Sequence, residues 1–327
     1  MDERQIQEEV QYFNRKLSEV IEQKMHGCTN KILYHVLNYI RDTKGKRLRP
    51  IVCLLSAEAV GGSRDRALYT AIAIELIHNA SLVHDDIIDE NSIRRKNPSN
   101  PARYGEKRAI VIGDFLFAFS CEMLARCGVP EVMGLVSSTI SDIAMGQYLE
   151  FSLRLSDIKE VTEQTYLEIA ALKTASIFTV CAASGALLGG GSETEIESLR
   201  GYGENLGIAY QIQDDVLDVC GDPAKTGKPV GLDIKNGERT LLVIHALNHS
   251  KPSEKAYLAE LMSNKRDIRN SDIDRVREIF VNSGSIDYAI QLSNDFVMRA
   301  KSCIAGLEDS EAKAKLLLIA DFTANRV

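Results

Sequence analysis

Apolar and polar residues recur along most of the chain with the three- to four-residue spacing of an amphipathic α-helix. The clearest segment is 67–89, where this spacing persists over about six turns with few helix-breaking residues. Further helices are expected at 31–41, 48–60, 113–127, 131–151, 162–188, 193–220, 238–248, 253–262, 271–282, 285–304 and 311–323. Glycine or proline marks many of the boundaries between them. No run of alternating residues predicts a β-strand.

This pattern predicts an all-α protein, with residues 1–327 folded as a single domain of about a dozen helices. Segments 177–188 and 208–219 are apolar on most faces, so we expect them to lie centrally in a helical bundle. The apolar stretch 177–188 is too short to cross a bilayer, so no transmembrane segment is expected. The first residues carry neither a basic start nor an apolar run, which argues against a signal peptide.

Charge and cysteine content restrict the function further. The formal net charge is −7, so the overall field of the protein disfavours nucleic acid as a partner. An anionic ligand would need a local basic cluster or metal ions. The chain has 7 cysteines, an odd number, with no CxxC pair, which argues against a disulfide framework or a zinc site. Reduced thiols in helix cores are expected, and they suit the cytoplasm.

Two clusters of aspartates lie in predicted helices. In the run His84–Asp89, Asp85 and Asp89 are one helical turn apart, so their carboxylates share a face and repel each other. Asp214 and Asp218 repeat this spacing in an otherwise apolar helix, with Gln211 on the same face. A cation would relieve the repulsion, and carboxylates with water and phosphate oxygens are the ligands that Mg²⁺ prefers. One such cluster could be a solvated helix end, but two predict a metal–diphosphate site if they face each other.

Basic residues stand near both acidic clusters and could bind phosphate oxygens. Any one of these groups could be an ordinary surface patch. Two of these basic groups lie just after an acidic cluster in the sequence, which favours one site formed by acidic and basic residues together. The groups are 44–49, 94–96, Lys173 and 225–228.

With these features together, the chain resembles the trans-isoprenyl diphosphate synthases, the polyprenyl synthetase family, from about residue 31 to 239. The likeness rests on GKRLRP at 45–50, ELIHNASLVHDDIID at 75–89, RR at 94–95, GD at 113–114, GQ at 146–147, KT at 173–174, QIQDDVLD at 211–218 and TGKPVGLD at 226–233. It implies a medium-chain prenyltransferase, such as a geranylgeranyl or geranylfarnesyl diphosphate synthase. The implied fold is an isoprenoid synthase bundle around a central cavity.

The resemblance also implies roles for individual residues. Those expected to hold about three Mg²⁺ ions are Asp85, Asp89 and Asp214 directly, with Asp86, Asp215 and Asp218 in support. Contacts to the allylic diphosphate are expected from Arg94, Lys173 and Lys228, and contacts to isopentenyl diphosphate from Lys46, Arg49, His78 and Arg95. Thr174 and Gln211 occupy the positions that stabilise the developing allylic cation.

The chain departs from the family pattern at two positions. Lys96 follows the paired arginines, where glycine is usual. Glu238 stands in the run Gly237–Thr240 where the family often has lysine, so it reverses a charge that elsewhere helps to neutralise diphosphate. Arg239 or Lys235 could substitute for the missing cation.

Product length is expected to depend on the residues that precede Asp85 on its helix. Ala80 and Ser81 lie about one turn before it and are small, and Ile77 lies one turn further. An aromatic residue there would stop chain growth early. Each turn is about 5 Å, near the length of one isoprene unit, so we expect a product of about C20–C25. Alternatively, another helix closes the tunnel through Met145, Tyr148 or Phe151.

Several alternatives remain on sequence alone. Within the family they are a farnesyl or a longer-chain synthase of C30 or more. Outside it they are a class I terpene cyclase, against which GKRLRP and His78 argue, and a non-catalytic synthase subunit, against which the two intact acidic motifs argue. The family also implies a homodimer, with Phe115, Leu116 and Phe119 as candidate interface residues.

Overall fold

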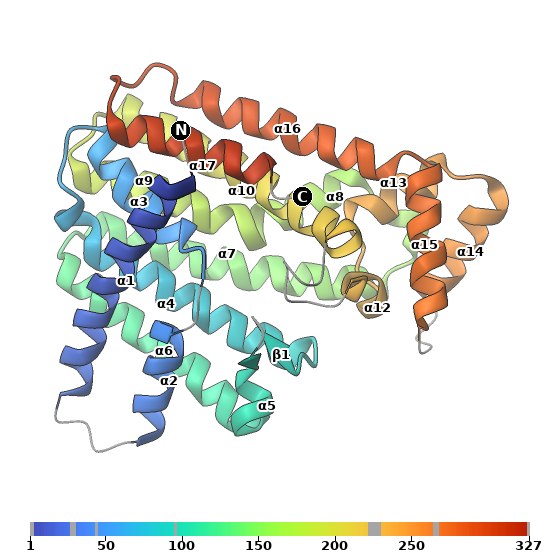
Figure 1. Ribbon diagram of the computed structural model, residues 1–327, viewed down its shortest axis with the longest axis horizontal. Helices are drawn as coiled ribbons and strands as arrows, with labels where there is room; N and C mark the ends of the chain where they lie inside the picture. The colour runs from blue at the N-terminus through green and yellow to red at the C-terminus, as the bar shows by residue number, and fades with distance from the viewer. Residues whose placement is uncertain are drawn as a thin grey trace. The chain divides into compact units, whose positions relative to one another are not determined.

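A computed structural model describes residues 3–26, 31–42, 45–94, 97–221, 230–263 and 268–325, and these residues are mostly α-helical (Figure 1). The predicted all-α class is confirmed. The chain divides into two compact units, which are described separately. The first comprises Met1–Ser137, Val180–Leu199 and Gly306–Ile319, and the second Ser138–Thr179, Arg200–Ala305 and Ala320–Val327. The single domain and its central cavity stay predictions.

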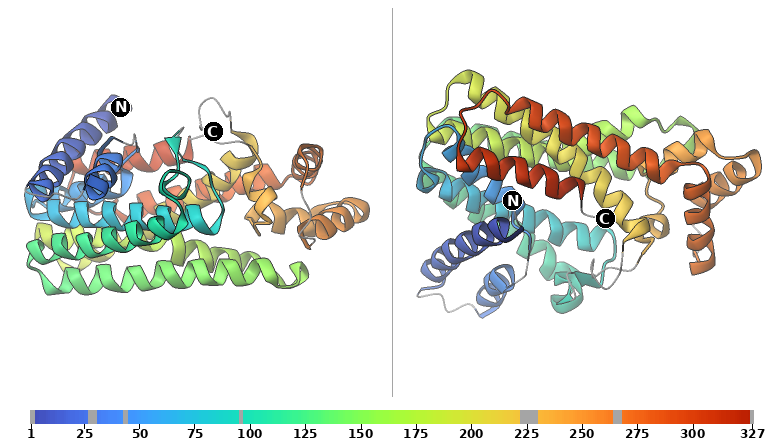
Figure 2. Two further views of the ribbon diagram at one scale, coloured as in Figure 1. Left: turned by 90° about the horizontal axis from the view of Figure 1, so that it is seen from below. Right: turned by 45° about the horizontal axis from the view of Figure 1, so that its top comes forward.

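The first unit is built around α4, which lies beside α3 and α6 (Figure 2). Its helices are α1 (Glu3–Met25), α2 (Lys31–Asp42), α3 (Leu48–Ala59), α4 (Arg64–Ile88), α5 (Asn100–Tyr104) and α6 (Glu106–Cys127). Strands β1 (Ile93–Arg94) and β2 (Asn97–Pro98) form a small antiparallel pair, in which Arg94 is opposite Asn97. This hairpin, which the sequence pattern did not predict, follows directly after the first acidic cluster.

In the second unit, α13 packs against α8, α14, α15 and α16. The bounds are α8 (Glu163–Ala170), α12 (Leu232–Asn236), α13 (Leu241–His249), α14 (Pro252–Ser263), α15 (Asn270–Asn282) and α16 (Ser285–Cys303). A 3₁₀ turn, η1 (Ile158–Glu160), and a π-helical turn, η2 (Ala171–Ala175), are also present. Residues of both units belong to α7 (Pro130–Leu155), α9 (Ser176–Gly189), α10 (Glu193–Cys220) and α17 (Glu311–Ala324).

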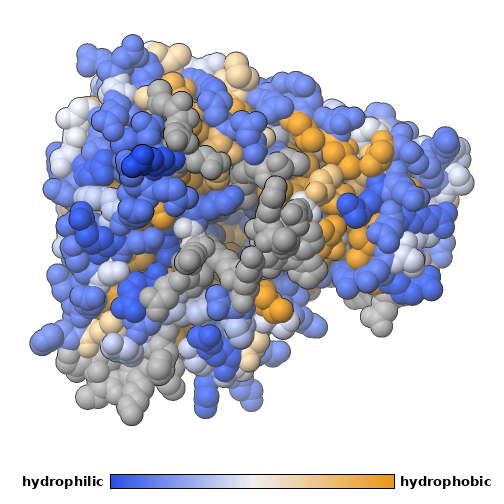
Figure 3. All heavy atoms as spheres, viewed as in Figure 1, coloured by the Kyte–Doolittle hydropathy of each residue, from blue (hydrophilic) through white to orange (hydrophobic). Residues whose placement is uncertain are grey.

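Some helices differ from the predicted ones. Helix α1 was missed, although its apolar residues Ile6, Phe13, Leu17 and Ile21 are buried on one side. Hydrophilic residues cover most of the face shown in Figure 3, as expected for helices whose apolar sides point inward. Helix α6 begins at Glu106, seven residues earlier than predicted. The predicted helix 162–188 contains the π-helical turn η2, which changes the direction of the side chains after it.

Burial bears on two expectations about apolar residues. Leu116 and Phe119 are 0% and 1% exposed, so they are core residues of their unit and not an exposed dimer face, whereas Phe115 is partly exposed and stays a candidate. Met145, Tyr148 and Phe151 are 54%, 68% and 49% exposed, so these side chains lie at the surface of the chain. Whether they close the product tunnel stays a prediction.

The most apolar helical stretch, Glu163–Gly189, is long and apolar enough to cross a membrane by length and composition. However, 67% of its apolar window is buried inside the protein, which is also what the core helix of a soluble protein shows. No cysteine in the described part of the chain forms a disulfide.

Candidate functional site

The first acidic cluster lies at the C-terminal end of α4, in the first unit. Helix α4 begins after Ser63, whose hydroxyl accepts a hydrogen bond from the Asp65 N–H (3.2 Å) and caps the helix. Asp85 and Asp89 are partly exposed, whereas Asp86 between them is only 1% exposed. The cluster therefore has two carboxylates towards its surface and one in the interior.

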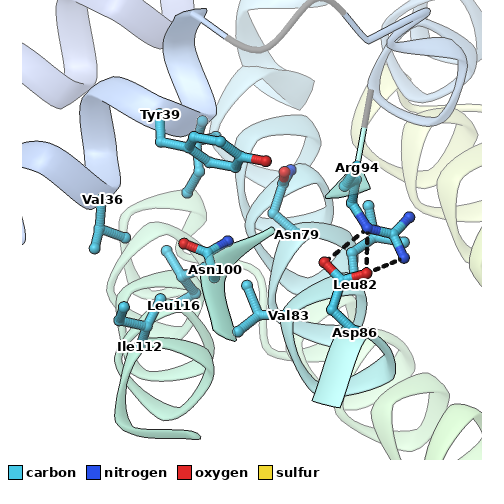
Figure 4. Close-up of a pocket in the computed structure, with 11 residues that line it drawn as sticks. Val36, Tyr39, Asn79, Leu82, Val83, Asp86, Arg94, Asn100, Ile112 and Leu116 are labelled. Carbon is cyan, nitrogen blue, oxygen red and sulfur yellow. Dashed lines mark hydrogen bonds and ion pairs between the residues drawn. The ribbon is translucent and has the colours of Figure 1, made fainter. Parts of the chain in front are cut away.

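The interior carboxylate of Asp86 is neutralised by Arg94 of β1 (Figure 4). Arg94 Nε lies 2.8 and 2.9 Å from the two carboxylate oxygens of Asp86, and Nη2 lies 2.6 Å from Oδ1. Burial opposes the charge on Arg94, but its hydrogen bonds and the charge of Asp86 outweigh this, so the pKa of Arg94 is raised. Arg94, expected at the allylic diphosphate, is thus held beside the first acidic cluster by this charge-assisted pair.

A small cavity lies beside the Asp86–Arg94 pair (Figure 4). It is lined by Val36, Tyr39, Ile40, Asn79, Leu82, Val83, Asp86, Arg94, Asn100, Ile112 and Leu116. An α-helix advances about 100° per residue, so Asn79, Val83 and Asp86 share one face of α4, roughly opposite Ile77 and Ser81. The cavity is therefore separate from the predicted chain-length surface. Ile77 and Ala80 are buried and Ser81 is partly exposed, and their role in chain length stays a prediction.

The expected isopentenyl diphosphate residues are partly brought together in the first unit. Arg49 Nη1 lies 3.4 Å from His78 Nε2, which joins the start of α3 to α4, and Lys46 is exposed. Arg95 and Lys228 lie outside the described residues.

A buried ion pair that sequence reasoning missed supports this loop. Arg47 has a left-handed backbone (φ 50°), which is uncommon for a residue with a side chain. Its guanidinium pairs with Glu75 of α4 and donates to Ile40 O (2.7 Å) and Asn14 Oδ1 (3.0 Å). Because the side chains of Arg47 and Glu75 are 0% and 3% exposed, the pair fixes the loop that carries Lys46 to α4.

The second acidic cluster lies in the second unit and, like the first, combines a buried carboxylate with a more exposed one. Asp214 is exposed, whereas Asp215 is buried and accepts hydrogen bonds from Tyr166 OH (2.7 Å) and Gln211 Nε2 (2.8 Å). Burial raises the pKa of Asp215 to about 7, although these two hydrogen bonds act in the opposite direction. Thr174 Oγ1 donates to Gln211 Oε1 (2.6 Å). Tyr166, Asp215, Gln211 and Thr174 therefore form one hydrogen-bonded chain.

Lys173 and Thr174 are both presented by the π-helical turn η2, a feature that often occurs at functional positions. Two glycines allow neighbouring helices to approach the backbone of this turn. A Cβ at Gly146 of α7 would lie 2.7 Å from Lys173 N, and one at Gly207 of α10 would lie 2.4 Å from the Cα of Ala175. The turn is therefore held between α7 and α10 at distances that no larger residue permits.

Asp218 has a local partner of its own. Its two carboxylate oxygens accept the N–H groups of Leu232 (3.2 Å) and Asp233 (3.1 Å) at the start of α12. Asp218 therefore connects the second acidic cluster to α12 by capping that short helix.

We expect Asp218→Ala to loosen α12, because two N–H groups at the start of this helix would lose their acceptors. Hydrogen exchange at the amides of Leu232 and Asp233 should become about fivefold faster, the equivalent of about 1 kcal/mol. Asp218→Asn keeps one acceptor oxygen and should have a smaller effect. Unchanged exchange in the alanine variant would exclude the capping role.

The arrangement of carboxylates fits magnesium shared with a phosphate ligand. Among the described residues, no three His, Cys, Asp or Glu side chains gather closely enough to enclose a metal ion. Mg²⁺ is commonly bound by one or two carboxylates, with water and substrate phosphates completing the octahedron. Asp85 and Asp89 in one unit and Asp214 in the other supply such oxygen donors at positions that are not sealed in the core. Whether the two acidic faces meet stays a prediction.

Comparisons with known proteins agree with this local chemistry. Residues 30–280 match the model of the polyprenyl synthetase family. The short chain isoprenyl diphosphate synthase of Methanothermobacter thermautotrophicus is 38% identical over 97% of this chain and 99% of that protein. The geranylgeranyl diphosphate synthase of Methanosarcina mazei is 36% identical over 90% of each.

A solved structure is also similar over nearly the whole chain. The polyprenyl synthase from Caulobacter crescentus, complexed with calcium and isoprenyl diphosphate, has a TM-score of 0.91 and 29% identity. The match covers 99% of this chain and 96% of that one.

Proposed function

The chain belongs to the polyprenyl synthetase family, and on this premise we propose that it condenses isopentenyl diphosphate with an allylic diphosphate, releasing pyrophosphate. The allylic substrate is dimethylallyl, geranyl or farnesyl diphosphate. The product is a trans-polyprenyl diphosphate of about C20–C25. This range is supported by the similarity to the geranylgeranyl diphosphate synthase of Methanosarcina mazei and by small residues spaced at about one isoprene unit per turn on α4.

The observation that carries this proposal is the shared organisation of the two acidic clusters. In each, the middle aspartate is buried and held by protein groups, Asp86 by Arg94 and Asp215 by Tyr166 and Gln211. The first aspartate of each cluster, Asp85 or Asp214, lies nearer the surface. Buried carboxylates held in this way orient the helix ends, so that the outer carboxylates are available to cations.

Magnesium ions held by Asp85, Asp89 and Asp214 would supply positive charge to the diphosphate of the allylic substrate. Arg94, Lys173 and Lys228 bind the same diphosphate and stabilise the charge that develops when the allylic C–O bond breaks. Fixed charges in a site that excludes water contribute strongly to such a step. Lys46, Arg49 and His78 orient isopentenyl diphosphate so that its double bond attacks the cation, and the departing pyrophosphate accepts the proton that is lost.

Thr174 and Gln211 stabilise the allylic cation in this mechanism. Asp215 accepts the Gln211 N–H, so the amide oxygen of Gln211 is directed to Thr174. Tyr166 donates to the other Asp215 oxygen and fixes the carboxylate. Because the hydrogen bonds of Tyr166, Gln211 and Thr174 fix these groups, the oxygen dipoles are oriented before the substrate ionises.

We also propose that the protein acts as a cytoplasmic homodimer and that residues 1–327 form one synthase domain. Exposed apolar side chains in each of the two units are available for contact with a second copy. They are Ile110 and Val111 on α6 and Met145, Tyr148, Phe151 and Leu155 on α7. These residues replace Leu116 and Phe119 as interface candidates, because the latter are buried within their unit.

The proposed activity is tested by incubating the purified protein with Mg²⁺, labelled isopentenyl diphosphate and each allylic primer in turn. Incorporation of the label, with a product mass of C20–C25, would support the proposal. A terpene cyclase or a non-catalytic subunit would incorporate no label. Removal of Mg²⁺ with a chelator should stop incorporation, and its return should restore it.

The product length is expected to fall in an Ala80→Phe variant. Ala80 is 0% exposed, so the ring must either enter the space used by the growing chain or strain the core. Product mass and thermal stability should be measured together. A stable variant with a shorter product supports the role of α4, whereas an active variant with the same product length excludes it.

A further inference from the structure

Four charged side chains of the second unit, Lys173 among them, are linked by contacts between opposite charges. Arg154 of α7 pairs with Glu238, its Nε lying 2.9 Å from Oε2. Arg154 Nη2 also lies 3.7 Å from Glu150 Oε2, and Lys173 Nζ donates to that same oxygen at 2.6 Å. The sequence of charges is therefore Glu238, Arg154, Glu150 and Lys173.

The carboxylate of Glu150 is shared between two cations that are not equally close. Lys173 is at hydrogen-bonding distance, whereas Arg154 is more than an ångström further away. Arg154 makes its shortest contacts with Glu238 instead. Glu238 thus determines how far the guanidinium can approach Glu150, and through Glu150 how firmly Lys173 is held.

Solvent only partly screens this network. The side chains of Glu238, Arg154, Glu150 and Lys173 are 13%, 16%, 21% and 24% exposed. Charges at such depth interact more strongly than fully exposed pairs. A change at Glu238 should therefore affect Lys173, three contacts away.

Arg239, one of the two residues expected to replace the missing cation at the diphosphate, is buried and donates to the carbonyl oxygens of Met262 (2.7 Å) and Arg154 (3.4 Å). Lys235, the other, is exposed, and its role stays a prediction. Glu238 itself, in the loop before α13, pairs with Arg154 of α7, which lies 84 residues earlier in the chain.

We propose that Glu238 and Arg154 are positioning residues that set the affinity of Lys173 for the diphosphate of the allylic substrate, acting through the shared carboxylate of Glu150. This inference rests on the proposed function, in which Lys173 binds that diphosphate. Glu238 keeps Arg154 away from Glu150, so Glu150 holds Lys173 and a phosphate must compete with it. If Glu238 is neutral, Arg154 turns to Glu150, the hold of Glu150 on Lys173 weakens, and a phosphate competes more easily for Lys173.

The test is a double-mutant cycle with inorganic pyrophosphate as the ligand. Its dissociation constant in the presence of Mg²⁺ is measured by calorimetry for the wild-type protein and for Glu238→Gln, a variant of nearly the same shape. We expect Glu238→Gln to bind pyrophosphate about two- to fivefold more tightly. The KM for the allylic diphosphate should fall similarly, with the KM for isopentenyl diphosphate unchanged.

Repeating the Glu238→Gln change in a second variant protein separates an effect that acts through Arg154 from a general effect of charge. In Arg154→Gln protein, the same Glu238→Gln change should have little effect, because no guanidinium is present to turn. Glu150→Gln provides an alternative background if Arg154→Gln folds poorly. Glu260→Gln, at an exposed position on α14, controls for the change in net charge. An equal gain in affinity in both backgrounds, or no gain in Glu238→Gln, overturns the inference.

The outcome is distinguishable from failure of the proposed function. Pyrophosphate binding requires no condensation, so the cycle can be completed on a protein that makes no product. Binding without condensation would overturn the proposed function alone. A wild-type protein that does not bind pyrophosphate with Mg²⁺ would overturn the inference about Lys173.

Discussion

Asp85→Ala and Asp214→Ala will each reduce turnover by roughly 10²- to 10³-fold at saturating Mg²⁺, a loss typical of removing one group that stabilises developing charge. Each substitution removes an outer carboxylate and leaves the buried partners of its cluster, the Asp86–Arg94 pair or the Tyr166–Asp215 hydrogen bond, in place. We therefore expect folded proteins with impaired metal and substrate binding. Steady-state turnover and Mg²⁺ titrations measure the effect.

A suitable control is Asp274→Ala, which removes an exposed carboxylate from α15 in the second unit. Its turnover and Mg²⁺ dependence should match those of the wild-type protein. If Asp85→Ala and Asp214→Ala also retained near-normal rates, neither acidic cluster would be a metal site, and the proposed mechanism would have to be abandoned.

A methyl group at Gly146 is expected to reduce turnover by about a hundredfold, the effect of misplacing a catalytic group by about 1 Å. The Cβ of Gly146→Ala would lie 2.7 Å from Lys173 N and 3.0 Å from Lys173 Cα, which is closer than non-bonded atoms tolerate. The π-helical turn must shift, and Lys173 and Thr174 shift with it. Turnover and the KM for the allylic substrate should both change.

Gly134 provides a matched control on the same helix. Nothing lies within 4 Å of a Cβ at this exposed position, so Gly134→Ala should stabilise α7 by up to about 1 kcal/mol and leave turnover unchanged. Thermal unfolding should distinguish a local shift from a general loss of stability. Wild-type turnover in a folded Gly146→Ala protein would show that the close contact does not position η2.

The sequence predicted what depends on local spacing. Asp85 and Asp89, or Asp214 and Asp218, share a helix face because they are one turn apart, and this can be read from the chain directly. The all-α class was predicted from the three- to four-residue spacing of apolar residues, and it is confirmed. Helix α1 has such a stripe as well, in Ile6, Phe13, Leu17 and Ile21, so its omission was an oversight of a signal that is present.

Contacts between distant segments could not be predicted in this way. Tyr166 and Asp215 are 49 residues apart, and Arg154 and Glu238 are 84 apart, so no local period relates them. The left-handed backbone of Arg47 carries no sequence signal either, because it is imposed by the contacts of its side chain. The π-helical turn could not be predicted for a related reason. Helices α7 and α10 approach it at Gly146 and Gly207 through tertiary contacts, which no local sequence pattern records.

The buried pair of Arg47 and Glu75 constrains how this chain can change. Loss of either partner leaves a lone charge in the interior, which typically costs about 3–5 kcal/mol, whereas replacing both with apolar residues of similar volume is often neutral. A path of single substitutions from one arrangement to the other therefore crosses a deeply unstable intermediate. Arg47 and Glu75 are therefore expected to change together during evolution. Neither the loop with Lys46 nor the middle of α4 can be moved into a related protein without the other.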